Sequence, residues 1–180
     1  CFEMLIFAKV FMKKVILFSS FILVGCVKHA PAYPPVGGIL SQKDLDISKN
    51  RSKNLNQVER SQIEDWIKNQ QEPFYTMSLN YWVNDKDLHL QTRKSNGERI
   101  SYEYEIYDFD MVKLYETPTQ KKDVVFGRFE ELKPVEDALR YMKKNQEVTL
   151  LIPSALGYGT YGDNDQISND MPLIIKLKVL

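Results

Sequence analysis

Residues 147–159 read EVTLLIPSALGYG and join an apolar run to a glycine-rich turn. Glu147–Pro153 is predicted to be a strand, because its Val, Thr, Leu and Ile side chains favour extended backbone. The strand is expected to end at Pro153, because proline cannot continue a hydrogen-bond ladder. A loop rich in glycine and aspartate follows from Ser154 to Asp170. Leu173–Leu180, LIIKLKVL, predicts another strand after this loop. These residues therefore indicate two strands joined by a long polar loop.

Alternating segments upstream predict further strands. Arg99–Tyr107 has an aromatic or aliphatic residue at each even position, as expected for a strand with one face against a core. Phe74–Val83 is aromatic and rich in β-forming residues, and Asp87–Thr92 alternates between polar and apolar residues. Asn96-Gly97 between these segments is a strong turn signal.

One helix is predicted within this β-rich region. Glu130–Tyr141 carries Leu132, Val135 and Leu139 at helical spacing, and Pro134 lies early enough to occupy the first turn. Together these elements predict an α+β fold, in which a mostly antiparallel sheet of five to six strands wraps on one short helix. We assign this domain to residues 73–180.

A second, more polar helical segment precedes the domain, at residues 41–72. Its apolar residues fall near one face at helical spacing and its charged residues fill the other side, so we expect a solvated surface helix with a modest docking stripe. The expected apolar stripe consists of Leu55, Val58, Ile63, Trp66 and Ile67, and the expected solvent side of Glu59, Arg60, Glu64, Asp65 and Lys68.

The amino-terminal residues carry an export pattern. The apolar run Val15–Val24 follows Met12-Lys13-Lys14, is too short to span a bilayer, and suits a signal peptide over residues 1–25. It ends in LVGC, which resembles the bacterial lipoprotein box and makes Cys26 the expected site of lipid attachment. An ordinary signal peptide with an incidental cysteine is the alternative. We interpret residues 1–11 as a candidate gene-model extension and the Pro-rich residues 26–40 as a tether.

Composition excludes several classes of function. The 24 basic and 24 acidic side chains balance, so the chain lacks the electrostatic footprint expected for nucleic-acid binding. Cysteine occurs only at positions 1 and 26, and histidine only at 29 and 89. These residues provide neither a disulfide framework nor the usual ligand set of a zinc or haem site, and we expect no metal and no cofactor.

Three motifs together resemble FK506-binding-protein-type peptidyl-prolyl isomerases. The loop PSALGYG, Pro153–Gly159, is followed by Gly162, Ile167 and the last strand, as in that family. The strand and turn YEIYDFD, Tyr104–Asp110, resemble an upstream family motif, and the resemblance covers about residues 99–180. Residues that fall where the family places its helix and the following strand are Leu132, Val135, Ala138, Met142 and Gln146. With the lipoprotein box and the stretch GYGTYGDND, the chain is similar to gliding-motility-associated isomerase lipoproteins of Bacteroidetes.

The resemblance implies a site and a role for each of its residues. Tyr158 would donate its hydroxyl to a substrate carbonyl, and the Leu132 backbone N–H would donate to another. The walls of a proline-binding cup would be Tyr104, Val135, Ile167 and Ile175, with Leu114 at the rim. Val135, Leu139 and Ile175 are also at core spacing, so we expect them to be core residues first. Tyr158 lies between two glycines in a polar loop, which favours a functional role.

Several family residues are replaced in this chain. Val135 stands at the tryptophan of the pocket floor, Leu114-Tyr115 at a phenylalanine–aspartate pair, Lys122 at a pocket aromatic and Ile175 at a phenylalanine of the last strand. We therefore expect a wider cup, unless Tyr115 or Phe126 turns into it. Asp163 and Asp165 are expected to be solvated loop residues.

Three functions remain open from the sequence. The first is an envelope lipoprotein that isomerises prolyl bonds and assists the folding of exported proteins, with a link to gliding motility. The second is a non-catalytic binding module, a structural lipoprotein of a gliding or secretion machine. The third is a lipoprotein of unrelated antiparallel fold. The first function predicts that the partners are proline-containing polypeptides. It also predicts that an amino-terminal lipid attaches the chain to a membrane, with the domain in the periplasm. The oligomeric state stays open.

Overall fold

The computed structural model describes residues 41–180, and residues 42–180 form one compact unit. The predicted signal peptide, the lipid-attachment residue Cys26 and the tether lie outside the described residues. The helices are α2 (Gln42–Lys68) and α3 (Lys133–Tyr141), with short 3₁₀ turns η1 (Leu88–Leu90) and η2 (Ser154–Leu156). The strands are β1 (Tyr75–Thr76), β2 (Trp82–Val83), β3 (Arg99–Tyr107), β4 (Thr119–Val125), β5 (Glu147–Ile152) and β6 (Leu173–Val179).

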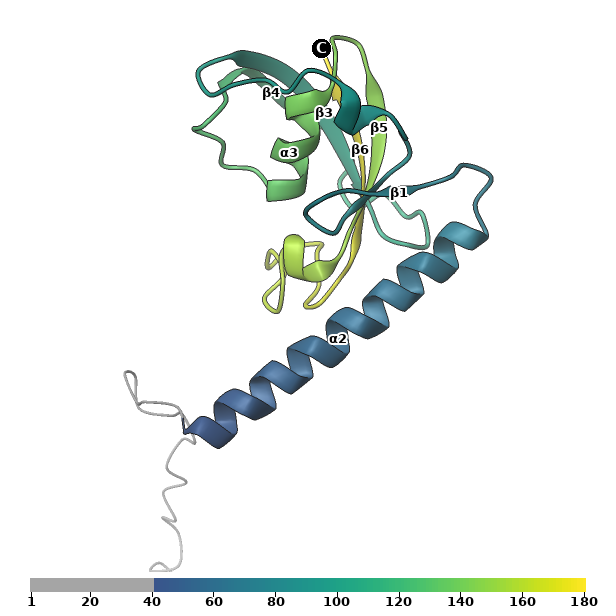
Figure 1. Ribbon diagram of the computed structural model, residues 1–180, viewed down its shortest axis with the longest axis vertical. Helices are drawn as coiled ribbons and strands as arrows, with labels where there is room; N and C mark the ends of the chain where they lie inside the picture. Colours follow the sequence, from purple (N-terminus) through teal and green to yellow (C-terminus); the bar gives the residue numbers. More distant parts are fainter. Residues whose placement is uncertain (1–40) are drawn as a thin grey trace, which may run out of the picture. The chain divides into compact units, whose positions relative to one another are not determined.

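The strands form one six-stranded sheet in the order β1-β2-β5-β6-β3-β4 (Figure 1). Each pairing between these strands is antiparallel. The predicted α+β fold, a mostly antiparallel sheet with a short helix and a preceding amino-terminal helix, is therefore confirmed. The central strand β6 pairs with β5 on one side and β3 on the other, which brings the segments before and after the polar loop together.

Each face of the sheet has its own apolar core. Alternate residues of β3, β5 and β6 join α3 in the main core, where Ile106, Leu150 and Ile175 are buried. The opposite side chains of β2, β5 and β6 form a smaller cluster with α2, made of Trp82, Leu151, Ile174 and Ile63. The period of two along the strands thus separates α3 and α2 onto the two faces.

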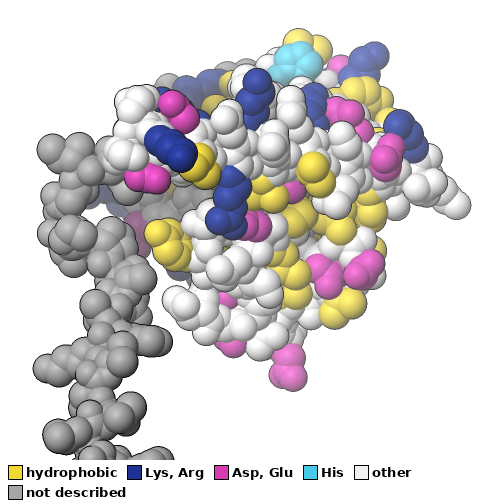
Figure 2. All heavy atoms as spheres, turned by 90° about the horizontal axis from the view of Figure 1, so that it is seen from below, with side chains coloured by type: hydrophobic (Ala, Val, Ile, Leu, Met, Phe, Trp, Pro, Cys, Tyr) yellow, Lys and Arg dark blue, Asp and Glu magenta, His cyan; other side chains and the backbone are white. Residues whose placement is uncertain are grey.

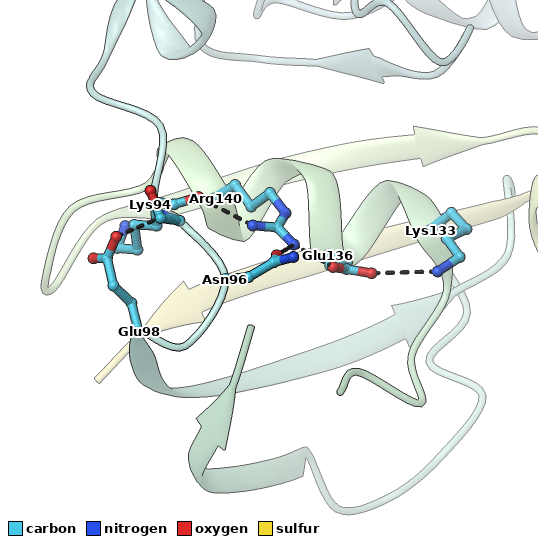
Figure 3. A network of polar contacts seen from close by, with 7 residues as sticks. Lys94, Asn96, Glu98, Lys133, Glu136 and Arg140 are labelled. Carbon is cyan, nitrogen blue, oxygen red and sulfur yellow. Dashed lines mark hydrogen bonds and ion pairs between the residues drawn. The ribbon is translucent and has the colours of Figure 1, made fainter. Parts of the chain in front are cut away.

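A network of polar contacts around Arg140 anchors the carboxyl-terminal end of helix α3 (Figure 3). The Arg140 guanidinium donates to the Lys94 carbonyl at 3.0 Å and to the Asn96 side chain and the Glu136 carboxylate at 2.8 Å each. The guanidinium also lies 4.9 Å from the ring centroid of Phe126. The predicted turn at Asn96-Gly97 is present, with Gly97 at a φ of +93°, and the network docks it on α3. The helix starts at Lys133, three residues later than predicted, with Pro134 in its first turn.

Two strand predictions were wrong in detail. Asp87–Thr92 contains the 3₁₀ turn η1 rather than a strand. Only Leu88 of this segment is buried, so the alternation of polar and apolar residues does not correspond to a buried and an exposed face. Phe74–Val83 is split into β1 and β2 by a tight turn, in which Asn80 has a φ of +63°. The edge strand β4 was not predicted, because its sequence TQKKDVV is polar and largely exposed.

Helix α2 packs with most of the predicted apolar stripe and differs from the prediction at two positions. Ile63 is fully buried and Trp66 and Ile67 are half-buried, as expected, but Val58 is 54% exposed. Glu59, expected on the solvent side, is only 3% exposed. The helix itself follows from its composition, since its 27 residues contain neither glycine nor proline.

The described surface is mixed in charge. On the face drawn in Figure 2, hydrophobic side chains lie among interspersed acidic and basic groups, without one continuous basic area. Neither α2 nor α3 has both the length and the apolar character that a bilayer-spanning helix needs.

Candidate functional site

The loop after β5 fixes the backbone on both sides of Tyr158. The carbonyl of Ser154 accepts hydrogen bonds from the N–H groups of Gly157 and Gly159, both at 2.9 Å. Gly159 has a φ of +58°, a conformation that favours glycine, and its carbonyl accepts the N–H of Asp170 at 2.8 Å. Tyr158 is therefore presented between two glycines whose positions are set by backbone hydrogen bonds.

The structure brings the expected site residues into one apolar cluster. Tyr158 is half-buried and packs on the main core, and the pocket residues expected from the resemblance either belong to that core or pack against it. The buried members are Tyr104, Val135, Ile167 and Ile175, and the half-buried ones are Leu114, Leu132 and Tyr158. Val135 and Ile175 are at most 1% exposed, so they support the cluster from within, as their core spacing predicted.

Phenylalanines compensate for part of the expected aromatic loss. Phe126 is turned inward and buried, and its ring stacks on Phe129 at a centroid distance of 5.0 Å. Phe129 in turn stacks on Tyr102 at 5.8 Å. Part of the aromatic character of the cluster therefore comes from the segment before α3, and Lys122, at the position of a family aromatic, is exposed on β4.

Glu131 is a site residue that sequence reasoning missed. Its carboxylate accepts the hydroxyl of Tyr102 at 3.1 Å and that of Tyr104 at 3.0 Å, and Lys121 lies 3.9 Å away. Burial, followed by the charge of Glu131, raises the pKa of Tyr104. A signal was present in the sequence, because two inward-facing tyrosines of β3 require a buried acceptor.

Asp163 is partly exposed, and it holds more contacts than the solvated loop residue that was expected. Its carboxylate accepts the Tyr115 hydroxyl and the N–H groups of Asp165 and Ile167, the last two at 2.9 Å each. Burial opposes ionisation of Asp163, but these hydrogen bonds hold its pKa below the ordinary value. The hydrogen bond from Tyr115 to Asp163 thus joins the segment that follows β3 to the tip of the loop that carries Ile167. Tyr115 stands at the position of the family aspartate. Asp165 itself is exposed, as predicted.

Tyr158 retains the proton that a donor needs. Burial raises the pKa of its hydroxyl, and the negative charges of Asp163 and Glu131 raise it further. Because the unperturbed tyrosine pKa is about 10, the group stays protonated through the neutral range. The arrangement therefore offers a neutral hydroxyl donor at the edge of an apolar cluster, with the Leu132 N–H at the start of α3 as the second expected donor.

Comparison with known proteins gives a family match. Residues 91–180 match the profile of the family described as FKBP-type peptidyl-prolyl cis-trans isomerase. A search of the curated proteins finds no match.

A solved peptidyl-prolyl isomerase is similar in fold, and two other solved structures match at TM-scores below 0.5. The isomerase of Pseudomonas syringae pv. tomato str. DC3000 is 16% identical, at a TM-score of 0.51 over 72% of this chain and 93% of that one. AtFKBP13 is 18% identical, at a TM-score of 0.47 over 59% of this chain and 95% of that one. The N-terminal domain of FKBP42 from Arabidopsis thaliana is 13% identical, at a TM-score of 0.48 over 61% and 91%.

Proposed function

Because the chain belongs to the FKBP-type peptidyl-prolyl cis-trans isomerase family, we propose that it catalyses the rotation of prolyl peptide bonds in proteins exported to a bacterial envelope. The observation that carries the proposal is the half-buried Tyr158, protonated and set against an apolar cluster within the family-matched segment.

The chemistry requires neither a nucleophile nor a metal. A peptide bond rotates over a barrier of about 20 kcal/mol because resonance gives its C–N bond double-bond character. Twisting the bond removes that resonance and makes the amide less polar, so an apolar site favours the twisted state over the planar one. In the proposed complex, Tyr158 and the Leu132 N–H hold substrate carbonyls, while Ile167 and Tyr104 exclude water from the proline ring.

The assay that tests this proposal uses the purified full chain in a coupled proline-isomerisation reaction at low temperature. We expect acceleration by the wild type and a loss of about tenfold in kcat/KM for Tyr158→Phe, since one hydrogen bond in the transition state corresponds to about 1.4 kcal/mol. Tyr161→Phe is the matched control, because Tyr161 lies on the same loop but is 83% exposed. The pH profile should be flat through neutrality and fall only above about pH 10, where a tyrosine with a raised pKa begins to ionise.

A non-catalytic binding module is the second candidate, and the residues at the cup favour it in part. Val135 and Ile175 are smaller than the aromatics of the family, and Tyr115 replaces an aspartate. A folded wild type that gives no acceleration, yet binds a proline-containing peptide with perturbed Tyr158 resonances, would establish this function instead. Equal kcat/KM for the wild type and Tyr158→Phe would contradict the proposed role of the hydroxyl.

We further propose that the chain is a lipoprotein of the cell envelope with its domain in the periplasm, and that it serves gliding motility. The support is the sequence Val15–Cys26, a short apolar run that ends in LVGC. Labelled palmitate should be incorporated into the wild-type chain in bacterial cells and not into Cys26→Ala. Equal incorporation into both chains would exclude Cys26 as the attachment site. Deletion of the gene should abolish gliding, and unchanged gliding would contradict the motility role.

A further inference from the structure

Helix α2 reaches the Tyr158 loop through one buried carboxylate. Glu59 is 3% exposed, and its two carboxylate oxygens accept the backbone N–H of Ser154, at 2.9 Å, and the Ser154 hydroxyl. The two residues are 95 positions apart, and Glu59 lies outside the family-matched residues 91–180. A buried carboxylate is costly unless its oxygens are hydrogen-bonded, so this placement requires the contact with Ser154.

Ser154 is the residue that organises the backbone around Tyr158. Its N–H and hydroxyl donate to Glu59, while its carbonyl accepts the N–H groups of Gly157 and Gly159. Those two glycines flank Tyr158 directly. A continuous set of hydrogen bonds therefore runs from the side chain of α2 through Ser154 to both neighbours of the proposed catalytic tyrosine.

The helix that carries Glu59 is itself held on the sheet. Ile63, one turn after Glu59, is buried against Trp82, Leu151 and Ile174. Arg60 lies 5.2 Å from the Trp82 ring centroid, and the Trp66 indole N–H donates to the carbonyl of Phe109 at 3.0 Å. These contacts hold the helix on the sheet within about two turns of Glu59, so the carboxylate is carried by a packed part of α2.

We infer that Glu59 is a positioning residue for the isomerase site, and that α2 acts as a brace for the Tyr158 loop. Without the carboxylate, the Ser154 N–H and hydroxyl lose their acceptors, and the turn that presents Tyr158 keeps only its own backbone hydrogen bonds and its packing on the main core. Reaction rates depend steeply on the position of the reacting groups, so a loosened tyrosine lowers turnover. The kinetic part of this inference rests on the proposed function, whereas the order of the loop can be measured without it.

The test compares Glu59→Ala with Glu59→Gln in the full chain. We expect Glu59→Ala to lower kcat by about tenfold with a smaller change in KM, and to speed amide hydrogen exchange at Gly157 and Gly159 by about tenfold or more. Glu59→Gln keeps the length of the side chain, so it can accept the Ser154 N–H and donate to the Ser154 hydroxyl; it should restore kcat to within about threefold of wild type. Asp65→Ala is the control, because Asp65 is an exposed acid on the same helix, paired with Lys68.

Each outcome decides the inference. Exchange at Gly157 and Gly159 within about twofold of wild type in a folded Glu59→Ala protein would overturn it. If Glu59→Ala does not fold, Ser154→Ala removes only the hydroxyl contact and should still speed exchange at both glycines; no change there would overturn the inference. If the wild type lacks isomerase activity, the proposed function fails, and the exchange rates alone decide whether α2 braces the loop.

Discussion

Gly162→Ala is expected to destabilise the Tyr158 loop by about 2–5 kcal/mol, because two separate costs combine at this position. Gly162 has a φ of +64°, which L-residues with a side chain rarely adopt. A Cβ built on Gly162 would also lie 2.1 Å from the carbonyl oxygen of Ile167, and that atom belongs to the backbone and cannot rotate away. The tip of the loop must therefore move, and with it the buried Ile167 of the site.

The matched variant is Gly159→Ala on the same loop. Gly159 has a similar φ of +58°, but an added Cβ would meet no atom within 4 Å. Gly159→Ala should therefore show only the conformational cost, about 1–2 kcal/mol. Thermal unfolding of both variants and the methyl resonances of Ile167 measure the difference. Equal destabilisation would mean that the Ile167 carbonyl does not crowd Gly162.

Ile63→Ala is expected to lower the free energy of unfolding by about 2–5 kcal/mol. Ile63 is fully buried in the cluster between α2 and the sheet, together with Trp82, Leu151 and Ile174. Truncation removes apolar contacts and leaves a cavity between α2 and the sheet, so the whole unit of residues 42–180 should unfold at a lower denaturant concentration.

Val58→Ala is the control for this prediction. Val58 lies on the same helix and was expected in the same apolar stripe, but it is 54% exposed. Its truncation should change stability by no more than about 0.5 kcal/mol. If Ile63→Ala is as mild as Val58→Ala in chemical denaturation, α2 does not contribute to the stability of the domain.

The main strands and the loop were predictable because their signals are local. In Arg99–Tyr107 the even residues were expected to point inward, and Ile100, Tyr102, Tyr104 and Ile106 are all buried. An alternating pattern of this length specifies which face meets the core, since a shift of one residue would expose every apolar side chain. The same holds for the strands on either side of the polar loop, whose bounds differ from the prediction only at their ends.

Short or polar segments could not be assigned in this way. DLHLQT alternates over six residues, but Leu90 is 71% exposed and the segment takes no part in the strand pairings of the described residues. β4 is a strand because the edge of β3 offers it hydrogen bonds, although most of its side chains are polar and exposed. In both segments tertiary context outweighed local pattern.

By itself, the sequence determined the α+β class, the alternation of the long strands and the PSALGYG loop that presents Tyr158, because each depends on the order of neighbouring residues. Only the tertiary structure decided which acids are buried. Glu59 is buried against Ser154, and Glu131 is half-buried beside two tyrosine hydroxyls of β3. The inward-facing tyrosines indicated that an acceptor was needed, but the sequence did not indicate which residue supplies it. A charged side chain is buried where distant donors satisfy it, and those donors meet it only after the sheet and α2 have packed together.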